Sequence, residues 1–422
     1  MGVKIALLTD CYPPRLGGIE VQVRDLAHRL AESGHQVEVF TATIGADDAR
    51  GGLIETSDGV TVHRMGILLP GRLPVNPLAA GEVRRRLAAG RFDVAHVHMG
   101  IISPFTVDCT HVALQVGLPV AMTWHCMLGP GEPLFHLTQV ARIWAKRGVT
   151  MSAVSATAAV PVQRVIGAAG RVAVVPNGID LARWWTPDTA EHPAMPAPSD
   201  GDLRVVTAMR LAMRKRPFAV LDVMAKVRRR MPDAPVRLTI LGDGRLRPAV
   251  EQAIRRRDMQ SWVDLPGRVD RQTLLQRYAE SHLYLSPAKL ESFGIAALEA
   301  RCVGLPVVGL RSSGASDFIT DGVNGYLAQD DEGMAARVAE LLGDHEARER
   351  MFRYNLSVPP AQDWAQVVAT TIGEYRRAAA ARGRRIPGDP LNGVAHPPGP
   401  HSATYRRRAS REERSRVLPT RR

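Results

Sequence analysis

The 422-residue sequence predicts an α/β protein built from two doubly wound, Rossmann-like domains that face each other across a cleft. Two observations predict this class. Short apolar runs of strand length alternate with segments whose apolar residues recur at helical spacing, and this alternation occurs twice. The chain is also longer than one hydrophobic core usually supports, so we expect each block to be a separate domain.

The first block, residues 1–185, begins with an apolar run at residues 3–8. Val21, Leu26 and Leu30 then recur at helical spacing. Further strands are predicted at residues 37–40, 60–64, 94–98, 119–123, 153–155 and 172–175. Short apolar strands separated by helices are typical of a parallel sheet that is covered on both faces.

A linker is predicted at residues 186–202, where Pro, Ala, Ser and Asp follow one another without periodicity. The second block, residues 203–360, repeats the alternation of strands and helices. Its strands are predicted at residues 203–207, 236–241, 263–265, 283–285, 306–308 and 326–327, with helices at 220–230 and 246–256. Two such domains place the carboxyl ends of two sheets around a common cleft, which is where doubly wound sheets bind ligands.

The net charge of +13 is concentrated at the end of the chain, in a predicted tail of residues 381–422. From Arg382 to Arg422 there are eleven Arg and three acidic residues, a net charge of +8. We interpret this segment as a solvated, disordered tail, because it cannot bury enough apolar area to offset its ordering entropy. The alternative is electrostatic contact with an anionic membrane surface. Nucleic acid is not expected as a partner, because Tyr405 is the sole aromatic residue among these charges.

The remaining composition favours a cytoplasmic protein. The four cysteines are scattered without metal-type spacing, which fits a reducing compartment. No window offers about 18 uninterrupted apolar residues, so no transmembrane helix is expected. Peripheral attachment at the inner face of the membrane is the alternative location.

The segment from Glu291 to Glu299 carries the strongest chemical signal. A helix that starts near Gly294 would offer unpaired N–H groups and a positive dipole end to a diphosphate. Glu291 would then face the cleft and bind sugar hydroxyls, while Glu299 in the second turn would bind a ribose. The plainer interpretation is one Glu that favours the helix dipole and a second, solvated Glu on the same helix.

This segment resembles the signature of the retaining family-4 glycosyltransferases, which have the GT-B fold. The likeness rests on Glu291 and Glu299, eight positions apart, with Phe293 and Gly294 between them. Other motifs of that family match in order along the chain, at residues 13–18, 93–98, 175–180, 210–215, 241–244, 267–269 and 321–325. Their joint order is specific, although each alone is weak. The resemblance also implies that a helix at residues 362–380 returns to cover the first domain.

The resemblance gives Arg210 and Lys215 a catalytic role. Both follow the first strand of the second domain, where two cations could stabilise the negative charge that develops on a leaving diphosphate. The family's usual Gly before the Arg is Met209 here, and the neighbouring Arg214 and Arg216 make the register of the match ambiguous. Surface solvation is the alternative interpretation.

The resemblance also assigns roles in the first domain and around the nucleotide. His125 is expected to face the donor sugar and diphosphate, whereas a lone His after a strand is more often structural. Gly17 and Gly18 permit close backbone approach to donor phosphates or to the acceptor, and a plain tight turn is the alternative. The other expected donor-binding positions are Ser292, Phe293, Gly294 and Ile295 in the signature, with Gly267 and Val269 near the base.

No metal ion and no cofactor are expected. His96 and His98 lie two residues apart on one strand, but a third ligand at suitable spacing is missing. Capping of a helix explains the acidic cluster at residues 330–332. Neither a dinucleotide fingerprint nor a P-loop occurs, which disfavours kinases, ATPases and NAD enzymes.

The sequence therefore predicts a metal-independent, retaining hexosyltransferase that uses a nucleotide-diphosphate sugar as donor. Its acceptor is a hydroxyl on a lipid, a glycan or a small molecule that the sequence does not name. Two alternatives remain open at this point: a nucleotide-sugar epimerase on the same fold, and a non-catalytic protein that docks on membranes.

Overall fold

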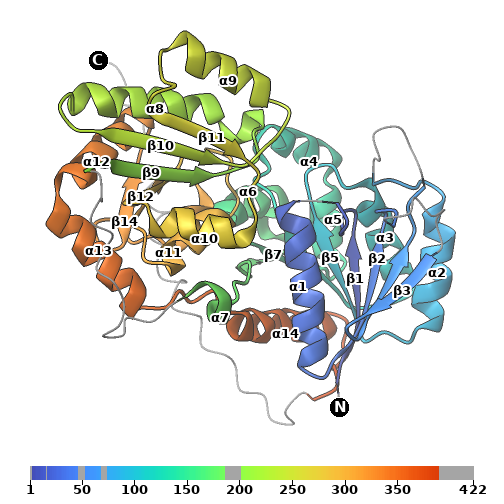
Figure 1. The fold of residues 1–422 in the computed structure, drawn as a ribbon. Coiled ribbons are helices and arrows are strands. Elements are labelled where there is room, and N and C mark those ends of the chain that lie inside the picture. Colours follow the sequence, from blue (N-terminus) through green and yellow to red (C-terminus); the bar gives the residue numbers. More distant parts are fainter. Residues whose placement is uncertain (1, 16, 46–52, 68–73, 186–200, 389–422) are drawn as a thin grey trace, which may run out of the picture. The chain divides into compact units, whose positions relative to one another are not determined.

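Two separate β-sheets organise the chain (Figure 1). The computed structural model describes residues 2–15, 17–45, 53–67, 74–185 and 201–388. The first sheet has eight strands in the order β3-β4-β2-β1-β5-β6-β7-β8, and the second has six in the order β11-β10-β9-β12-β13-β14. In each sheet the strand order reverses at the strand that comes first in the chain, which is β1 in the first sheet and β9 in the second, as in doubly wound folds. We call the parts built on these sheets the first and the second lobe.

The strands of the first sheet lie close to the predicted positions. They are β1 (Lys4–Thr9), β2 (Gln36–Thr41), β3 (Leu53–Ser57), β4 (Val60–Arg64), β5 (Val94–Met99), β6 (Val120–Trp124), β7 (Thr150–Ala153) and β8 (Val172–Val174). Alternate residues of β1 enter two different cores: Ala6 and Leu8 pack on one face, Ile5 and Leu7 on the other. A strand buried on both faces needs apolar residues at every position, which explains the continuous run.

Helices cover both faces of this sheet. They are α1 (Gly18–Glu32), α2 (Ala79–Ala89), α3 (Pro104–Gln115), α4 (Glu132–Thr138), α5 (Val140–Lys146), α6 (Ala156–Ile166) and the short α7 (Leu181–Trp184). Side chains of α2 to α6 contribute to the core on one face. On the other face, α1 packs together with α14 (Trp364–Ala380), as the returning helix was predicted to do.

Two details of the first sheet differ from expectation. The edge strand β3 was not predicted, and it pairs antiparallel with β4 in an otherwise parallel sheet. The strand predicted at residues 153–155 ends at Ala153, because Ser155 caps α6 instead: its hydroxyl accepts a hydrogen bond from the Ala158 N–H at 3.0 Å. An apolar run alone does not reveal such a cap.

The second sheet is parallel throughout. Its strands are β9 (Leu203–Ala208), β10 (Val236–Leu241), β11 (Val263–Gly267), β12 (Leu283–Ser286), β13 (Val307–Leu310) and β14 (Gly325–Ala328). Its helices are α8 (Pro217–Arg230), α9 (Arg247–Arg256), α10 (Arg271–Ala279), α11 (Ile295–Cys302), α12 (Asp331–Gly343) and α13 (His345–Ser357). Val205 and Val206 of β9 point into separate cores on the two faces, so this sheet too is covered on both sides.

The end of the packed chain lies later than predicted. The tail was expected to start at residue 381, but Ile386 is 4% exposed and belongs to the core that α1 and α14 share. The Arg384 N–H also donates to the Ala379 carbonyl at 2.9 Å. One apolar residue that docks next to a buried helix end is enough to hold these residues. The described chain up to Pro387 belongs to one compact unit, and the rest of the predicted tail, like most of the predicted linker, lies outside the described residues.

Among the described helices, none is both long and apolar enough to cross a membrane.

The fold predicts a large stability difference between two leucines. Leu341 of α12 is fully buried in the core of the second lobe, whereas Leu137 of α4 is 82% exposed. We expect Leu341→Ala to lower the free energy of unfolding by about 3 kcal/mol, because it leaves a cavity in a close-packed interior. The matched change Leu137→Ala should alter it by less than about 0.5 kcal/mol. Denaturant unfolding of both variants measures this, and equal losses would contradict the assigned packing.

Candidate functional site

The loops that follow β9 and β12 lie side by side because these two strands are neighbours in the sheet. Leu283 and Tyr284 of β12 pair in parallel with Val205 and Val206 of β9. Parallel strands end at the same edge, so the loop at residues 209–216 meets the loop at residues 287–294 there. The predicted cations lie on the first loop, and the predicted acid Glu291 lies on the second.

An ion pair joins the two loops. The Lys215 ammonium bonds to a carboxylate oxygen of Glu291. The side chains are 24% and 14% exposed, so water screens this pair less than it screens pairs on an open surface. The structure thus brings together two of the residues predicted to be catalytic.

Arg216 anchors the same loop, a role that sequence analysis did not find. Its guanidinium makes two bonds to the Asp331 carboxylate, at 2.9 and 2.6 Å, and donates to the Pro287 carbonyl at 2.9 Å. The guanidinium holds the pKa of Asp331 below its usual value. Arg216 is therefore committed to a structural bond, which leaves Lys215 as the cation that faces Glu291.

Arg210 lies on the exposed loop between β9 and the short turn Met213–Lys215. Beside it, the backbone of Met209 lies close to Gly242, which directly follows the neighbouring strand β10. Gly242 has φ of +126°, and a Cβ there would lie 2.0 Å from the Met209 carbonyl oxygen. The tight approach therefore involves the backbone of Met209 and not its side chain, so Met at this position is compatible with the fold.

The helix α11 begins where the sequence predicted it. Gly294 precedes it with φ of +96°, a conformation that favours glycine, and its carbonyl accepts from the N–H groups of Ala297 and Leu298. Ser292 and Ile295 are half-buried on either side of this turn. Phe293 corrects the expectation of donor contact. Its side chain is 1% exposed and packs on Phe318 in the core, so only its backbone can face a ligand.

Glu299 lies in the second turn of α11, where its side chain is half-buried. Burial raises the pKa of its carboxyl to about 8, and the nearby Arg271 opposes this effect. Among the residues that the structure describes, none hydrogen-bonds to this carboxyl. A half-buried carboxyl without a hydrogen-bonding partner in the protein is suited to a ligand that supplies hydroxyl groups.

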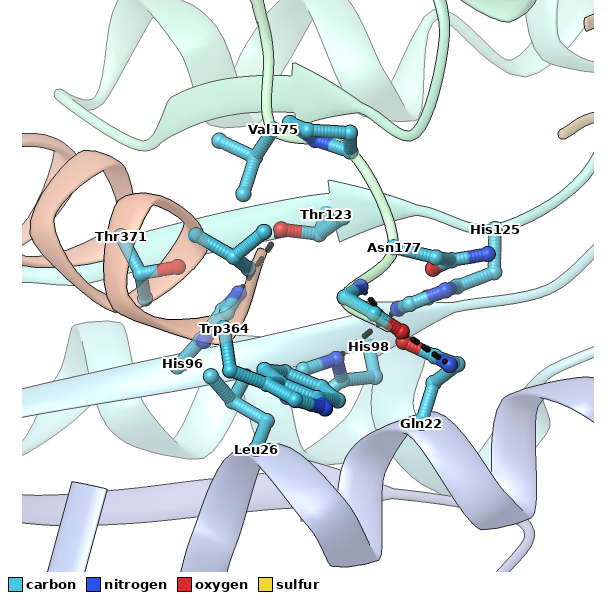
Figure 2. A pocket seen from close by; sticks show the side chains of 13 residues that line it. Gln22, Leu26, His96, His98, Thr123, His125, Val175, Asn177, Trp364 and Thr371 are labelled. Atoms are coloured by element: carbon cyan, nitrogen blue, oxygen red, sulfur yellow. Dashed lines mark hydrogen bonds between the residues drawn. The ribbon is translucent and has the colours of Figure 1, made fainter. Parts of the chain in front are cut away.

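His125 connects the first lobe to the loop before α11 through its backbone. Its carbonyl accepts a hydrogen bond from the Ser292 hydroxyl at 2.8 Å. Its imidazole points into the first lobe, where Nε2 lies 2.9 Å from Nδ1 of His98 and Asn177 lines the same small cavity (Figure 2). Sequence analysis placed the imidazole against the donor sugar. The structure shows the carbonyl of His125 turned toward the loop at residues 287–294, and the contact of its imidazole with a donor sugar stays a prediction.

The glycine loop of the first lobe also meets the signature helix. A Cβ on Gly18, the first residue of α1, would lie 3.7 Å from Cδ1 of Ile295. Gly17 precedes it in an extended conformation and lies against Glu20. Because these two glycines have no side chains, the backbone at the start of α1 can lie close to the second lobe.

Gly267 and Val269, the residues predicted to lie near the base, belong to the second lobe, at the end of β11 and just after it. Gly267 ends β11 with φ of +91°, and its carbonyl accepts from the Gly242 N–H at 2.7 Å. Val269 packs in the same apolar cluster as Ile295. Asp330 of the acidic cluster caps α12 through the Gly333 N–H at 2.8 Å, as predicted. In the described part of the chain, no group of three His, Cys, Asp or Glu side chains is arranged to hold a metal ion.

Three contacts bring predicted site residues together in pairs: Lys215 with Glu291, Ser292 with His125, and Ile295 with Gly18. Sequence analysis missed Arg216, Arg271 and Asn177. No motif marks Arg216 or Arg271, because each acts through a residue far away in the chain. Asn177 does belong to a matched motif, but nothing local indicates that it lines a cavity together with His125.

Two family models match most of the chain. Residues 16–183 match the model described as Glycosyltransferase Family 4. Residues 188–357 match the model described as Glycosyl transferases group 1. The boundary between the two matches falls at the predicted linker.

Curated relatives align over nearly their full length. A D-inositol 3-phosphate glycosyltransferase of Pseudarthrobacter chlorophenolicus is 29% identical over 406 residues, which cover 89% of this chain and 94% of that protein. A phosphatidyl-myo-inositol mannosyltransferase of Mycolicibacterium smegmatis is 28% identical over 360 residues, covering 82% of this chain and 88% of that protein. These relatives are named as glycosyltransferases.

Solved structures of glycosyltransferases share the fold. Sucrose-phosphate synthase of Thermosynechococcus elongatus superposes with a TM-score of 0.68 at 17% identity, covering 90% of this chain and 100% of that one. HepE of Anabaena, in complex with UDP-glucose, has a TM-score of 0.65 at 18% identity, covering 88% and 99%. The predicted pair of Rossmann-like sheets in the GT-B arrangement is thereby confirmed.

The buried carboxyl of Glu299 predicts a pH-dependent stability. The folded protein keeps this proton up to about pH 8, whereas the unfolded chain releases it near the usual value of 4.5. The folded state binds more protons between these values, so the carboxyl destabilises the fold increasingly as the pH rises through this window. Glu299→Gln should therefore gain stability relative to wild type, by about 2 kcal/mol on going from pH 5 to pH 9.

Denaturant unfolding at both pH values measures this difference. The exposed Glu346, at the start of α13, provides the matched control: Glu346→Gln should show the same difference from wild type at both pH values. A constant difference for Glu299→Gln would contradict the burial assigned to its carboxyl.

Proposed function

Because the chain belongs to glycosyltransferase family 4, we propose that it transfers a sugar from a nucleotide-diphosphate sugar to a hydroxyl acceptor, with retention of the anomeric configuration and without a metal ion. One observation carries this proposal. The Lys215–Glu291 ion pair and the half-buried carboxyl of Glu299 lie on the loop and helix of one sheet edge, where a charged donor would need a cation, sugar ligands and a ribose ligand.

The donor binds to the second lobe in this proposal. Glu299 accepts hydrogen bonds from the ribose hydroxyls, and the base lies near Gly267 and Val269. Lys215, Arg210 and the N–H groups at the start of α11 bind the diphosphate. HepE of Anabaena, which shares the fold, was solved in complex with UDP-glucose, and this supports a nucleotide sugar as donor.

In this proposal Lys215 pairs with Glu291 before the donor binds and with the diphosphate afterwards. Without donor, its charge is neutralised by Glu291. When the diphosphate binds, the ammonium moves to the phosphate oxygens and Glu291 is released to bind hydroxyl groups of the sugar. The carbonyl of His125 accepts a hydrogen bond from Ser292 of the same loop and completes the sugar site from the first lobe. Fixed cations that meet a developing charge are among the strongest contributors to catalysis.

The proposed reaction takes place on one face of the sugar. The bond from the anomeric carbon to the β-phosphate oxygen breaks, and an oxocarbenium-like state develops. The acceptor oxygen forms its bond on the same face, and its proton passes to the departing phosphate oxygen. Lys215 and Arg210 balance the charge on the nucleoside diphosphate that leaves. No carboxylate nucleophile on the opposite face is required by this scheme.

The acceptor hydroxyl enters from the first lobe, past Gly17 and Gly18. The relatives named for D-inositol 3-phosphate and for phosphatidyl-myo-inositol provide two acceptors to test, one small and water-soluble and one a lipid. A lipid acceptor would place the enzyme at the inner face of a membrane, with the basic residues after Arg382 near anionic headgroups. A soluble acceptor would leave it free in the cytoplasm.

A donor screen tests the proposed function. Purified protein is incubated with UDP- and GDP-linked sugars in the presence of EDTA, with and without each inositol acceptor. We expect release of one nucleoside diphosphate only when acceptor is present, and a product with the anomeric configuration of the donor by NMR. Epimerisation of the donor without acceptor would indicate the epimerase alternative, and an inverted product or loss of activity in EDTA would contradict the mechanism.

Removing either cation should affect catalysis more than donor binding. We expect Arg210→Ala or Lys215→Ala to lower kcat by about 100-fold, because the charge on the leaving diphosphate is greatest in the transition state. Donor affinity, measured by calorimetry, should fall by less than about tenfold. The exposed Arg256 of α9 supplies the control, since Arg256→Ala should leave both quantities unchanged. An unchanged kcat would rule out the assigned role.

A further inference from the structure

The loops that carry Lys215 and Glu291 are also joined at their base, by the side chain of Tyr284. This residue lies on β12, the neighbour of β9 in the second sheet (Figure 1). Tyr284 is 3% exposed, and its hydroxyl meets the backbone of Ala208, the last residue of β9. The hydroxyl accepts from the Ala208 N–H at 3.2 Å and donates to the Ala208 carbonyl at 3.0 Å. Tyr284 therefore ties β12 to the start of the loop at residues 209–216, which we call the cation loop.

The chemistry of the groups fixes the direction of both bonds. An amide N–H can only donate and a carbonyl oxygen can only accept, so the phenol of Tyr284 must accept one bond and donate the other. Burial raises the pKa of this phenol, which keeps it protonated and able to do both. A phenylalanine at this position would supply the same ring but would leave the N–H and the carbonyl of Ala208 without this partner.

The hydroxyl bridges the two strands where their own pairing has ended. The β9–β12 ladder ends at the pair of Tyr284 and Val206. Both strands continue for two residues beyond this pair, to Ser286 and Ala208, and there each pairs with its other neighbour in the sheet. The strand order of this sheet reverses at β9, and doubly wound sheets bind their ligands at the carboxyl ends of the strands beside such a point. The Tyr284 hydroxyl thus replaces strand pairing at the edge of the donor site.

The cation loop is attached to β12 and to the loop after β12 at both of its ends. At the start, Ala208 is bonded to Tyr284. At the end, the Arg216 guanidinium donates to the Pro287 carbonyl at 2.9 Å. Lys215 lies between these two fixed points. A short segment fixed at both ends has far fewer conformations than a segment fixed at one end, so both attachments help to place the Lys215 ammonium.

The bond at the base and the ion pair close a ring. Lys215 lies seven residues after Ala208, and Glu291 lies seven residues after Tyr284. The ring therefore consists of two chain segments of equal residue number, joined by the phenol at one end and by the ion pair at the other. A change at the base alters how the ammonium and the carboxylate face each other. An error of about 1 Å in such a position can cost about 100-fold in rate.

A second buried tyrosine of the same apolar cluster bonds to a different element. Tyr278 of α10 packs edge to face on Tyr284, with the ring centroids 5.8 Å apart. The Tyr278 hydroxyl donates to the Ala296 carbonyl of α11 at 3.4 Å. The two residues share their chemistry, their burial and their apolar surroundings, and they differ in the backbone group that each one holds.

We propose that Tyr284 is a positioning residue: its hydroxyl holds Ala208 and thereby fixes the base of the cation loop, so that Lys215 stays within reach of Glu291 and of the donor diphosphate. The bond to Ala208 does not depend on the function proposed above, whereas its effect on catalysis rests on that function. Tyr284 itself lies in the core beneath α11 and touches no substrate in this arrangement.

Hydrogen exchange of the Ala208 amide, followed by NMR on the full-length protein, measures the bond directly. Tyr284→Phe removes the hydroxyl and keeps the ring, and Tyr278→Phe is the matched control. We expect slow exchange in wild type and in Tyr278→Phe, and exchange at least about tenfold faster in Tyr284→Phe, because the amide loses its acceptor. An unchanged rate in Tyr284→Phe, or an equal increase in Tyr278→Phe, would overturn the proposal. So would exchange in wild type as fast as at the exposed Arg214, even if no variant folds.

Kinetics measure the effect on the cation loop, with the donor and acceptor found in the screen above. We expect Tyr284→Phe to lower kcat by about tenfold, because a cation that is no longer held in place stabilises the leaving diphosphate less well. Donor affinity should fall by less than about threefold, and Tyr278→Phe should keep kcat within about twofold of wild type. An unchanged kcat in Tyr284→Phe, or the same loss in both variants, would contradict the positioning role.

A double-mutant cycle tests whether Tyr284 acts through Lys215. In the Lys215→Ala background the positioned cation is absent, so the addition of Tyr284→Phe should lower kcat by less than about twofold more. A further tenfold loss in that background would show that the hydroxyl acts independently of Lys215, against the proposal. If wild type transfers no sugar at all, the proposed function fails, while the exchange rates still decide whether Tyr284 holds the base of the cation loop.

Discussion

The ion pair between Lys215 and Glu291 is the interaction on which the site depends. It forms because β9 and β12 are adjacent parallel strands, so the loops that leave their carboxyl ends share one edge of the sheet. Arg216 supports it from the side, through Asp331 at the start of α12 and the carbonyl of Pro287. A donor diphosphate would therefore replace Glu291 as the partner of a cation that the fold already holds in position.

The two lobes meet through contacts that involve the same helix starts. Ser292 donates to the His125 carbonyl and Gly18 lies against Ile295, both next to the start of α11. Further away, the Asp317 carboxylate of the second lobe accepts from the Ala156 N–H at the start of α6, at 2.7 Å. A carboxylate at a helix N-terminus is favoured by the unpaired N–H groups and by the helix dipole. A movement of the lobes on donor binding would have to exchange these contacts together with the apolar packing of Val154 and Ile179 on the second lobe.

The loop at residues 287–294 shows what motifs and periodicity can predict and what they cannot. Gly294 and the start of α11 were predicted correctly, since a helix start with a glycine at positive φ is a local property. Phe293 was assigned to the donor but lies in the core, because the same motif supplies residues for packing and for binding. The contact of His125 with the donor sugar stays a prediction, and the structure adds that its carbonyl accepts from Ser292 while its imidazole bonds to His98.

The sequence by itself determined the two alternating blocks, the buried strands and the helix starts, because each depends on hydrophobic period and turn chemistry within a short window. Only the tertiary structure decided that Lys215 bonds to Glu291 while Arg216 bonds to Asp331, since the partners lie 76 and 115 residues apart. It also decided that Glu299 is half-buried without a hydrogen-bonding partner among the described residues, and that three histidines line one small cavity. Ion pairs and pKa values depend on which atoms are close in space and on how much water reaches them, and local spacing along a chain contains neither quantity.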